Sequence, residues 1–297
     1  MIVESRGRLH EFIYAIGAAE LPGYLVTAGI PTLFDAGITF MGPLYLAELK
    51  EILTDHHRLS YHFLTHSHFD HAGASPYLRR RIPGLKIGAA AAAADTFRKP
   101  QAVELIRSLS AGLEEKYRFL TGDEDIQFSG LEIDLVLTEG MRITLGKGLS
   151  CQVIATPGHT RDSLSFYLPE IKSLITGEAV GVFDRNFKIH PEFTSSYHDY
   201  LNSLNKLAAL DIEILMMSHF FTLTGTDARD FLPHSLAETI AFKDRIEHYL
   251  NDSHGNRQAV AERIFKEDFE DTGAILQDAR PYRINLEAKI RVIAENR

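Results

Sequence analysis

Thr65-His66-Ser67-His68-Phe69-Asp70-His71 is the stretch of this sequence that decides the fold. It follows the apolar run 61–65, which predicts a buried strand, and it precedes Ala72-Gly73. Imidazole groups bind zinc, iron and manganese, and a carboxylate adds a harder ligand. Four side chains of the stretch can bind a metal in this way: His66, His68, Asp70 and His71. Because four ligands so close in sequence do not easily reach one ion, we expect the first two to bind one ion and the last two a neighbouring ion. A histidine-rich surface turn is the alternative, and this spacing after an apolar strand argues against it.

The stretch resembles the metal-binding signature of the metallo-β-lactamase superfamily, and the resemblance extends over about residues 8–225. Asp35-Ala36-Gly37 is also similar to the early Asp-x-Gly turn of that family. In such proteins further ligands lie at the ends of later strands. The resemblance therefore implies three more ligands: His159 in Thr156-Pro157-Gly158-His159-Thr160, Glu178 in Thr176-Gly177-Glu178-Ala179, and His219 in Met217-Ser218-His219.

Two positions depart from the family pattern. Glu178 stands where an aspartate that bridges two ions is expected. Its extra methylene leaves three outcomes open, because the carboxylate can bridge both ions, bind one of them, or favour another metal. Met217-Ser218-His219-Phe220 lacks the glycines that usually flank the last histidine. All seven positions nevertheless carry a side chain that can bind a metal.

Apolar periodicity predicts a core in which strands followed by a helix occur twice. Strand patterns occupy 9–16, 24–28, 31–34, 61–65, 133–137, 142–145, 151–155, 164–168, 173–176 and 212–217, and helical patterns occupy 44–53, 101–120 and 200–210. This order is compatible with an α/β protein in which two mixed sheets pack face to face between helices. The resemblance implies the αββα sandwich of the metallo-β-lactamase fold. We expect a metal-binding domain over residues 1–230. Residues 231–297 are predicted to be a helical extension that packs on this domain and narrows access to the metals, since their apolar stripes need a partner surface.

The ligand set predicts two divalent metal ions, with zinc as the expected metal and iron or manganese as alternatives. Two ions about 3.5–4 Å apart lower the pKa of a shared water towards ~7, and the resulting hydroxide attacks a carbonyl carbon. Asp70 is the predicted catalytic residue, because it can orient this hydroxide as well as bind a metal. A serine or cysteine nucleophile is then not required. The single cysteine, Cys151, lies in an apolar strand pattern that predicts a buried side chain.

The predicted activity is that of a metallo-hydrolase of thioesterase or esterase type with a small ester or thioester substrate. The pattern from Thr156 to Tyr167 resembles glyoxalase II-like thioester hydrolases, and the overall layout resembles the quinolone-signal-response thioesterases. These resemblances imply an acyl thioester, of which a coenzyme A thioester is one form. Three alternatives stay open: a lactonase with the same ligands, a sulfur dioxygenase with one iron at the first histidine site, and a non-catalytic, metal-stabilised regulatory module.

Composition and charge narrow the partners of the chain. A net charge of −9 is a poor match for a polyanion, so we expect a small-molecule substrate and no nucleic acid. Membrane association is not expected, because no apolar run approaches ~20 residues and the N-terminus lacks the apolar region of a signal peptide. A cytoplasmic location is expected, and a homodimer is left open. The histidines outside the ligand set are expected at the surface or at helix ends.

Overall fold

The computed structural model describes residues 1–295 and contains two compact units, each of which is discontinuous in sequence. The first unit comprises residues 1–155, 162–177 and 211–228. The second comprises residues 156–161, 178–210 and the chain from residue 229 onward. Each unit is described separately below.

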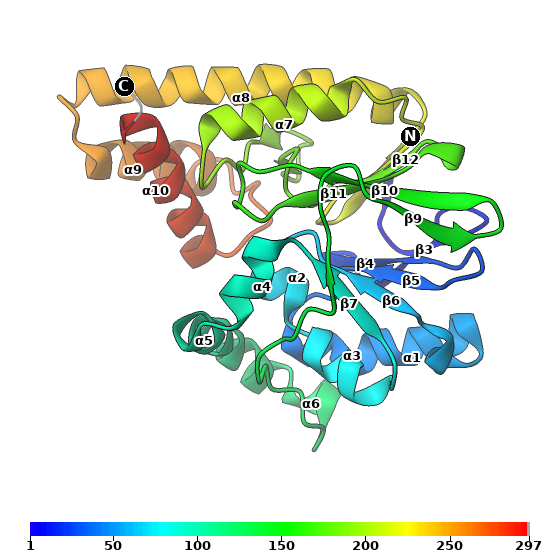
Figure 1. Ribbon diagram of the computed structural model, residues 1–297. Coiled ribbons are helices and arrows are strands. Elements are labelled where there is room, and N and C mark those ends of the chain that lie inside the picture. Colours follow the sequence, from blue (N-terminus) through cyan, green and yellow to red (C-terminus); the bar gives the residue numbers. More distant parts are fainter. Residues whose placement is uncertain (296–297) are drawn as a thin grey trace. The chain divides into compact units, whose positions relative to one another are not determined.

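The first unit contains two mixed sheets of seven strands each (Figure 1). One has the order β2 (Gly7–Arg8), β3 (Ile13–Ala18), β4 (Leu21–Val26), β5 (Thr32–Phe34), β6 (Tyr61–Phe63), β7 (Lys86–Ala89) and β8 (Leu135–Val136). The other has the order β1 (Ile2–Glu4), β16 (Phe221–Thr224), β15 (Ile214–Met216), β12 (Ser173–Ile175), β11 (Leu164–Leu168), β10 (Leu149–Ala155) and β9 (Arg142–Gly146). Neighbours are parallel from β5 to β8 and between β12 and β15, and antiparallel elsewhere. The predicted α/β class with two mixed sheets is confirmed.

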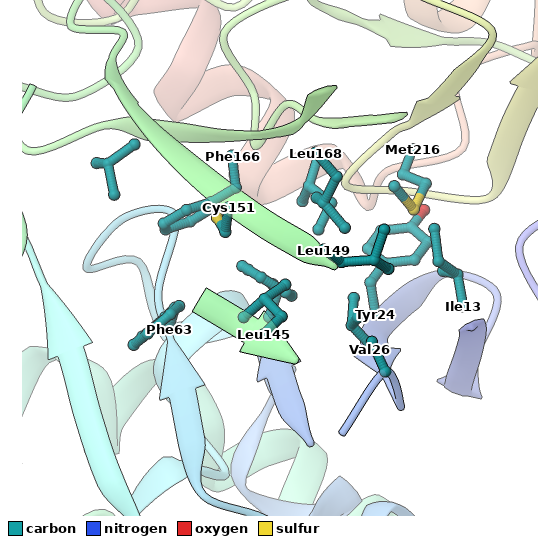
Figure 2. Close-up of a cluster of buried hydrophobic side chains, with 14 of the residues drawn as sticks. Ile13, Tyr24, Val26, Phe63, Leu145, Leu149, Cys151, Phe166, Leu168 and Met216 are labelled. Atoms are coloured by element: carbon teal, nitrogen blue, oxygen red, sulfur yellow. The ribbon is translucent and has the colours of Figure 1, made fainter. Parts of the chain in front are cut away.

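An apolar core fills the space between these two sheets (Figure 2). Successive side chains of a strand point to opposite faces, so alternate residues of β10, such as Cys151 and Val153, enter this core. The rings of Phe34 and Phe166, one from each sheet, lie 4.9 Å apart between centroids. Cys151 is fully buried, as the sequence predicts.

Helices cover the outer face of the β2–β8 sheet (Figure 1). They are α1 (Gly42–Leu53), α2 (Phe69–Ala72), α3 (Ser75–Arg81), α4 (Ala91–Phe97), α5 (Pro100–Lys116) and α6 (Arg118–Thr121). Short 3-10 turns lie at Thr39–Met41, at His56–Arg58 and, between β11 and β12 of the other sheet, at Pro169–Ile171. The helix predicted over 101–120 is present as α5, but it is interrupted at Tyr117 before α6. The backbone of Tyr117 leaves the helical region, and its ring stacks on Phe40 at 4.5 Å between centroids.

The second unit is mainly helical. It holds the hairpin of β13 (Val182–Phe183) and β14 (Ile189–His190), α7 (Tyr197–Ala208), most of α8 (Thr226–Asp252), α9 (Arg257–Phe265), a π-helical turn at Lys266–Glu270, and α10 (Ala279–Glu295). The helical stripes predicted after residue 231 lie on α8 and α10, and residues 296 and 297 of the predicted extension lie outside the described residues. Among residues 1–295, no helix combines the length and the apolar character that crossing a membrane requires.

Candidate metal centre

Five of the seven predicted ligands belong to the first unit, where they follow the ends of two strands. The chain leaves β6 at Phe63 and reaches His66 three residues later, and α2 then carries Asp70 and His71 in its single turn. His219 lies between β15 of the other sheet and β16. The segments that follow one strand of each sheet, β6 and β15, therefore carry the five predicted ligands of this unit.

The imidazoles of the four predicted histidine ligands in the first unit form a continuous cluster. Ring centroids lie 4.6 Å apart for His66 and His68, 4.1 Å for His66 and His71, and 5.5 Å for His71 and His219. Ligand atoms of Asp70, His71 and His219 all lie within 4.8 Å of one another, and so do those of His66 and His68. Groups of side chains such as these could hold metal ions.

Asp35 orients two of these histidines: His71 directly, and His66 through Thr65. Its buried carboxylate accepts hydrogen bonds from the Thr65 backbone N–H at 2.8 Å, the Thr65 hydroxyl at 2.7 Å and His71 Nδ1 at 3.0 Å. Because the Thr65 hydroxyl proton is directed to Asp35, Thr65 Oγ1 accepts from His66 Nδ1, at 3.0 Å. Asp35 has φ +58°, a left-handed conformation that aspartate tolerates better than most residues. The sequence marked Asp35 only as part of a turn.

The second unit carries the two remaining predicted ligands. His159 Nε2 lies 3.5 Å from a carboxylate oxygen of Glu178, and both side chains are buried. The loop 156–161 that holds His159 rests directly on α7. A Cβ at Gly158, where φ is +133°, would lie 2.3 Å from Tyr200 Cα, so only glycine fits this approach. Thr194 Oγ1 donates to the His159 carbonyl at 2.6 Å, which fixes the loop on its other side.

Four of the histidines share one arrangement that tests whether they suit a metal. His159 Nδ1 donates to the Glu192 carbonyl at 2.7 Å, and His219 Nδ1 donates to the Glu20 carbonyl at 2.8 Å. Together with His66 and His71 above, each ring therefore carries its proton on Nδ1. A neutral imidazole protonated there has its lone pair on Nε2, which is how metal-binding histidines are held in proteins. The side chains fit divalent ions on this test.

Two histidines outside the ligand set contradict the expectation of surface positions. His62 on β6 is fully buried, its Nε2 lies 2.8 Å from Ser75 Oγ, and burial lowers its pKa to about 4. His190 is buried in the second unit and its Nε2 donates to Asp184 at 3.0 Å. Each places a ring nitrogen next to a polar partner inside the protein, as buried polar groups usually do. A histidine seen alone in a sequence gives no sign of such a partner.

The chain is similar to known proteins over most of its length. A family model described as the metallo-beta-lactamase superfamily matches residues 23–219. "Lactamase-like protein vrtG" of Penicillium aethiopicum is 28% identical over 202 residues, which are 66% of this chain and 51% of that protein. "Beta-lactamase-like protein 2 homolog" of Caenorhabditis elegans is 28% identical over 182 residues, 59% of this chain and 47% of that protein. The chain spans about half the length of these curated relatives.

A solved structure supports the fold over nearly the whole chain. The archaeal metallo-beta-lactamase superfamily protein ST1585 from Sulfolobus tokodaii is similar with a TM-score of 0.59 and 17% sequence identity. The similarity covers 98% of this chain and 99% of that one, so it includes the C-terminal helices.

Proposed function

Because this chain belongs to the metallo-beta-lactamase superfamily, we propose that it is a metal-dependent hydrolase of a small ester or thioester, with an acyl thioester as the preferred substrate class. The observation that carries the proposal is the set of Nδ1-anchored histidines beside Asp70, because this arrangement presents ligand atoms and a carboxylate at one place. Bound divalent ions would supply an activated water and polarise the carbonyl of the substrate.

The proposed ligand set keeps the seven predicted positions. His66, His68 and His159 would hold one ion, and Asp70, His71 and His219 would hold the other, with Glu178 between or near them. Chain connectivity supports this set. Leu164, which pairs with Ala155 where the loop 156–161 departs, donates its N–H to the Thr65 carbonyl at 2.7 Å. A Cβ at Gly177 would lie 3.0 Å from Thr65 Cβ, and Glu178 is the next residue. The strand end that precedes the His159 loop and the residue that precedes Glu178 therefore both lie close to Thr65, the residue before His66.

In this proposal Asp70 would bind a metal and would orient the water that bound divalent ions activate. Its side chain is 17% exposed, so it is not sealed within the protein. The single thiol of the chain is not a competing nucleophile, because Cys151 is enclosed in the core between the sheets and burial raises the pKa of its thiol.

A metal analysis combined with a substrate panel tests the function. We expect the purified protein to retain about two equivalents of zinc and to hydrolyse thioesters or simple esters faster than lactones or β-lactams. A chelator should remove this activity and added Zn²⁺ should restore it. One equivalent of iron with oxygen consumption in the presence of a persulfide would instead indicate a sulfur dioxygenase, and a metal-loaded protein inactive on the whole panel would contradict the proposal.

The substitution Glu178→Asp tests whether this carboxylate bridges the two ions. Removing one methylene moves the carboxylate relative to both, so we expect the affinity for the second zinc ion to change by about 10-fold while the first equivalent remains bound. Zinc titration by calorimetry measures both steps. Glu132→Asp, an exposed change of the same kind in the first unit, is the matched control and should leave both steps unchanged. Identical titrations for Glu178→Asp and the wild type would show that Glu178 does not bridge.

A further inference from the structure

Helix α10 carries a lysine that is almost completely buried. Lys289 is 2% exposed, and its Nζ donates to Glu192 Oε1 at 2.9 Å and to the Pro191 carbonyl at 3.0 Å. Asn285, one turn earlier on the same helix, donates to Glu192 Oε2 at 3.2 Å. Glu192 is itself 4% exposed, so one helix holds both carboxylate oxygens of a buried acid and the preceding carbonyl.

The backbone of this buried acid holds a predicted metal ligand. The Glu192 carbonyl accepts from His159 Nδ1 at 2.7 Å. The Glu192 N–H in turn donates to Tyr200 Oη at 3.3 Å. Residue 192 is therefore anchored at its side chain by α10 and at its backbone N–H by α7, and its carbonyl faces the imidazole.

We propose that Lys289 is a positioning residue of the metal centre: by holding Pro191 and Glu192 it fixes the carbonyl that orients the His159 imidazole. The inference rests on the proposed function, because it takes His159 to be a metal ligand. It assigns the C-terminal helix a role in the site, since this helix becomes part of the chain of contacts that sets the geometry of one predicted ligand. Residues of this kind behind metal-binding histidines typically alter metal affinity when they are changed.

The chemistry of the contact explains why lysine is suited to this position. A buried ammonium group is costly unless charge and hydrogen bonds compensate it, and Lys289 has a carboxylate and a carbonyl as partners. Methionine has a similar length and no charge. Lys289→Met therefore leaves the volume filled but removes both bonds, and it leaves the Glu192 carboxylate buried without its cation.

The experiment measures zinc release from the full-length, zinc-loaded protein to a chromogenic chelator. We expect Lys289→Met to accelerate release of one of the two zinc ions by about 10-fold and to leave the other release phase unchanged. Asn285→Ala removes a single bond to Glu192 and should show a smaller acceleration of the same phase, which keeps the test available if the methionine variant does not fold. In ¹⁵N-labelled protein, the Nδ1 proton of His159 should exchange with water faster in both variants.

Arg245→Met is the matched control, because it breaks a different, partly buried ion pair of the same unit. Arg245 donates two hydrogen bonds to Asp268, and neither bond involves His159 or Glu192. We expect it to lower the melting temperature without accelerating zinc release. Equal release rates for Lys289→Met and Arg245→Met, compared at the same interval below each melting temperature, would overturn the inference. A wild-type protein that retains no zinc would contradict the proposed function, and this inference with it.

Discussion

Asp70→Asn is expected to lower the turnover number for the ester or thioester substrate by about 100-fold or more, while most of the bound metal is retained. The amide still offers an oxygen to a metal, but it has no negative charge with which to hold a water in the attacking direction or to accept its proton. The loss should therefore appear in kcat more than in KM. Steady-state kinetics and metal analysis on the same preparation measure both quantities.

The control for this prediction is Asp123→Asn, which makes the same chemical change at an exposed position of the first unit. It should match the wild type in turnover and in metal content. Full activity of Asp70→Asn on an identified substrate would show that another group orients the water. Loss of the metal together with the activity would show that Asp70 acts mainly as a ligand.

Asp35→Asn is expected to weaken zinc binding by about 10- to 100-fold and to lower the free energy of unfolding by about 2–4 kcal/mol. The carboxylate of Asp35 accepts three hydrogen bonds from Thr65 and His71, and an amide can accept only with its oxygen. Its NH₂ group would face donors, so the His71 ring would turn or change its tautomer. Asparagine adopts the left-handed backbone of this position about as well as aspartate, so the change isolates the side chain.

Asp184→Asn provides a matched comparison for this second prediction. Asp184 also accepts three hydrogen bonds, from the N–H groups of Asn186 and Lys188 and from His190 Nε2, but it contacts none of the predicted ligands in the second unit. Zinc titration and urea denaturation should show comparable destabilisation for both variants and weakened zinc binding for Asp35→Asn alone. Equal zinc affinities in the two variants would contradict the role of Asp35.

The predictions from sequence succeeded for the family and for the local structure around its signature. The histidine stretch follows a strand directly, and both this strand and membership of the superfamily are confirmed. Strand periodicity also indicated the buried position of Cys151, because alternate residues of a strand share one face. Each of these patterns can be recognised within a segment of about ten consecutive residues.

The contacts behind the ligands could not be predicted in this way. Asp35 meets His71 across 36 positions of sequence, and Lys289 meets Glu192 across 97. The residues around Lys289 in the sequence do not distinguish it from a lysine on a solvent-exposed helix face. The burial of His62 has the same origin, since its partner Ser75 belongs to another element. The break at Tyr117 is not visible in the helical pattern of 101–120 either, and the ring that Tyr117 stacks on, Phe40, lies far away in sequence.

The enclosed thiol of Cys151 has a practical consequence for all of these experiments. It is the only sulfhydryl group in the sequence and it lies between the two sheets, so an alkylating reagent reaches it only when the sandwich opens (Figure 2). Its rate of labelling is therefore a gauge of opening events in the native protein, and it needs no introduced probe. A variant that releases zinc quickly while its thiol labels slowly has lost the metal from an intact first unit.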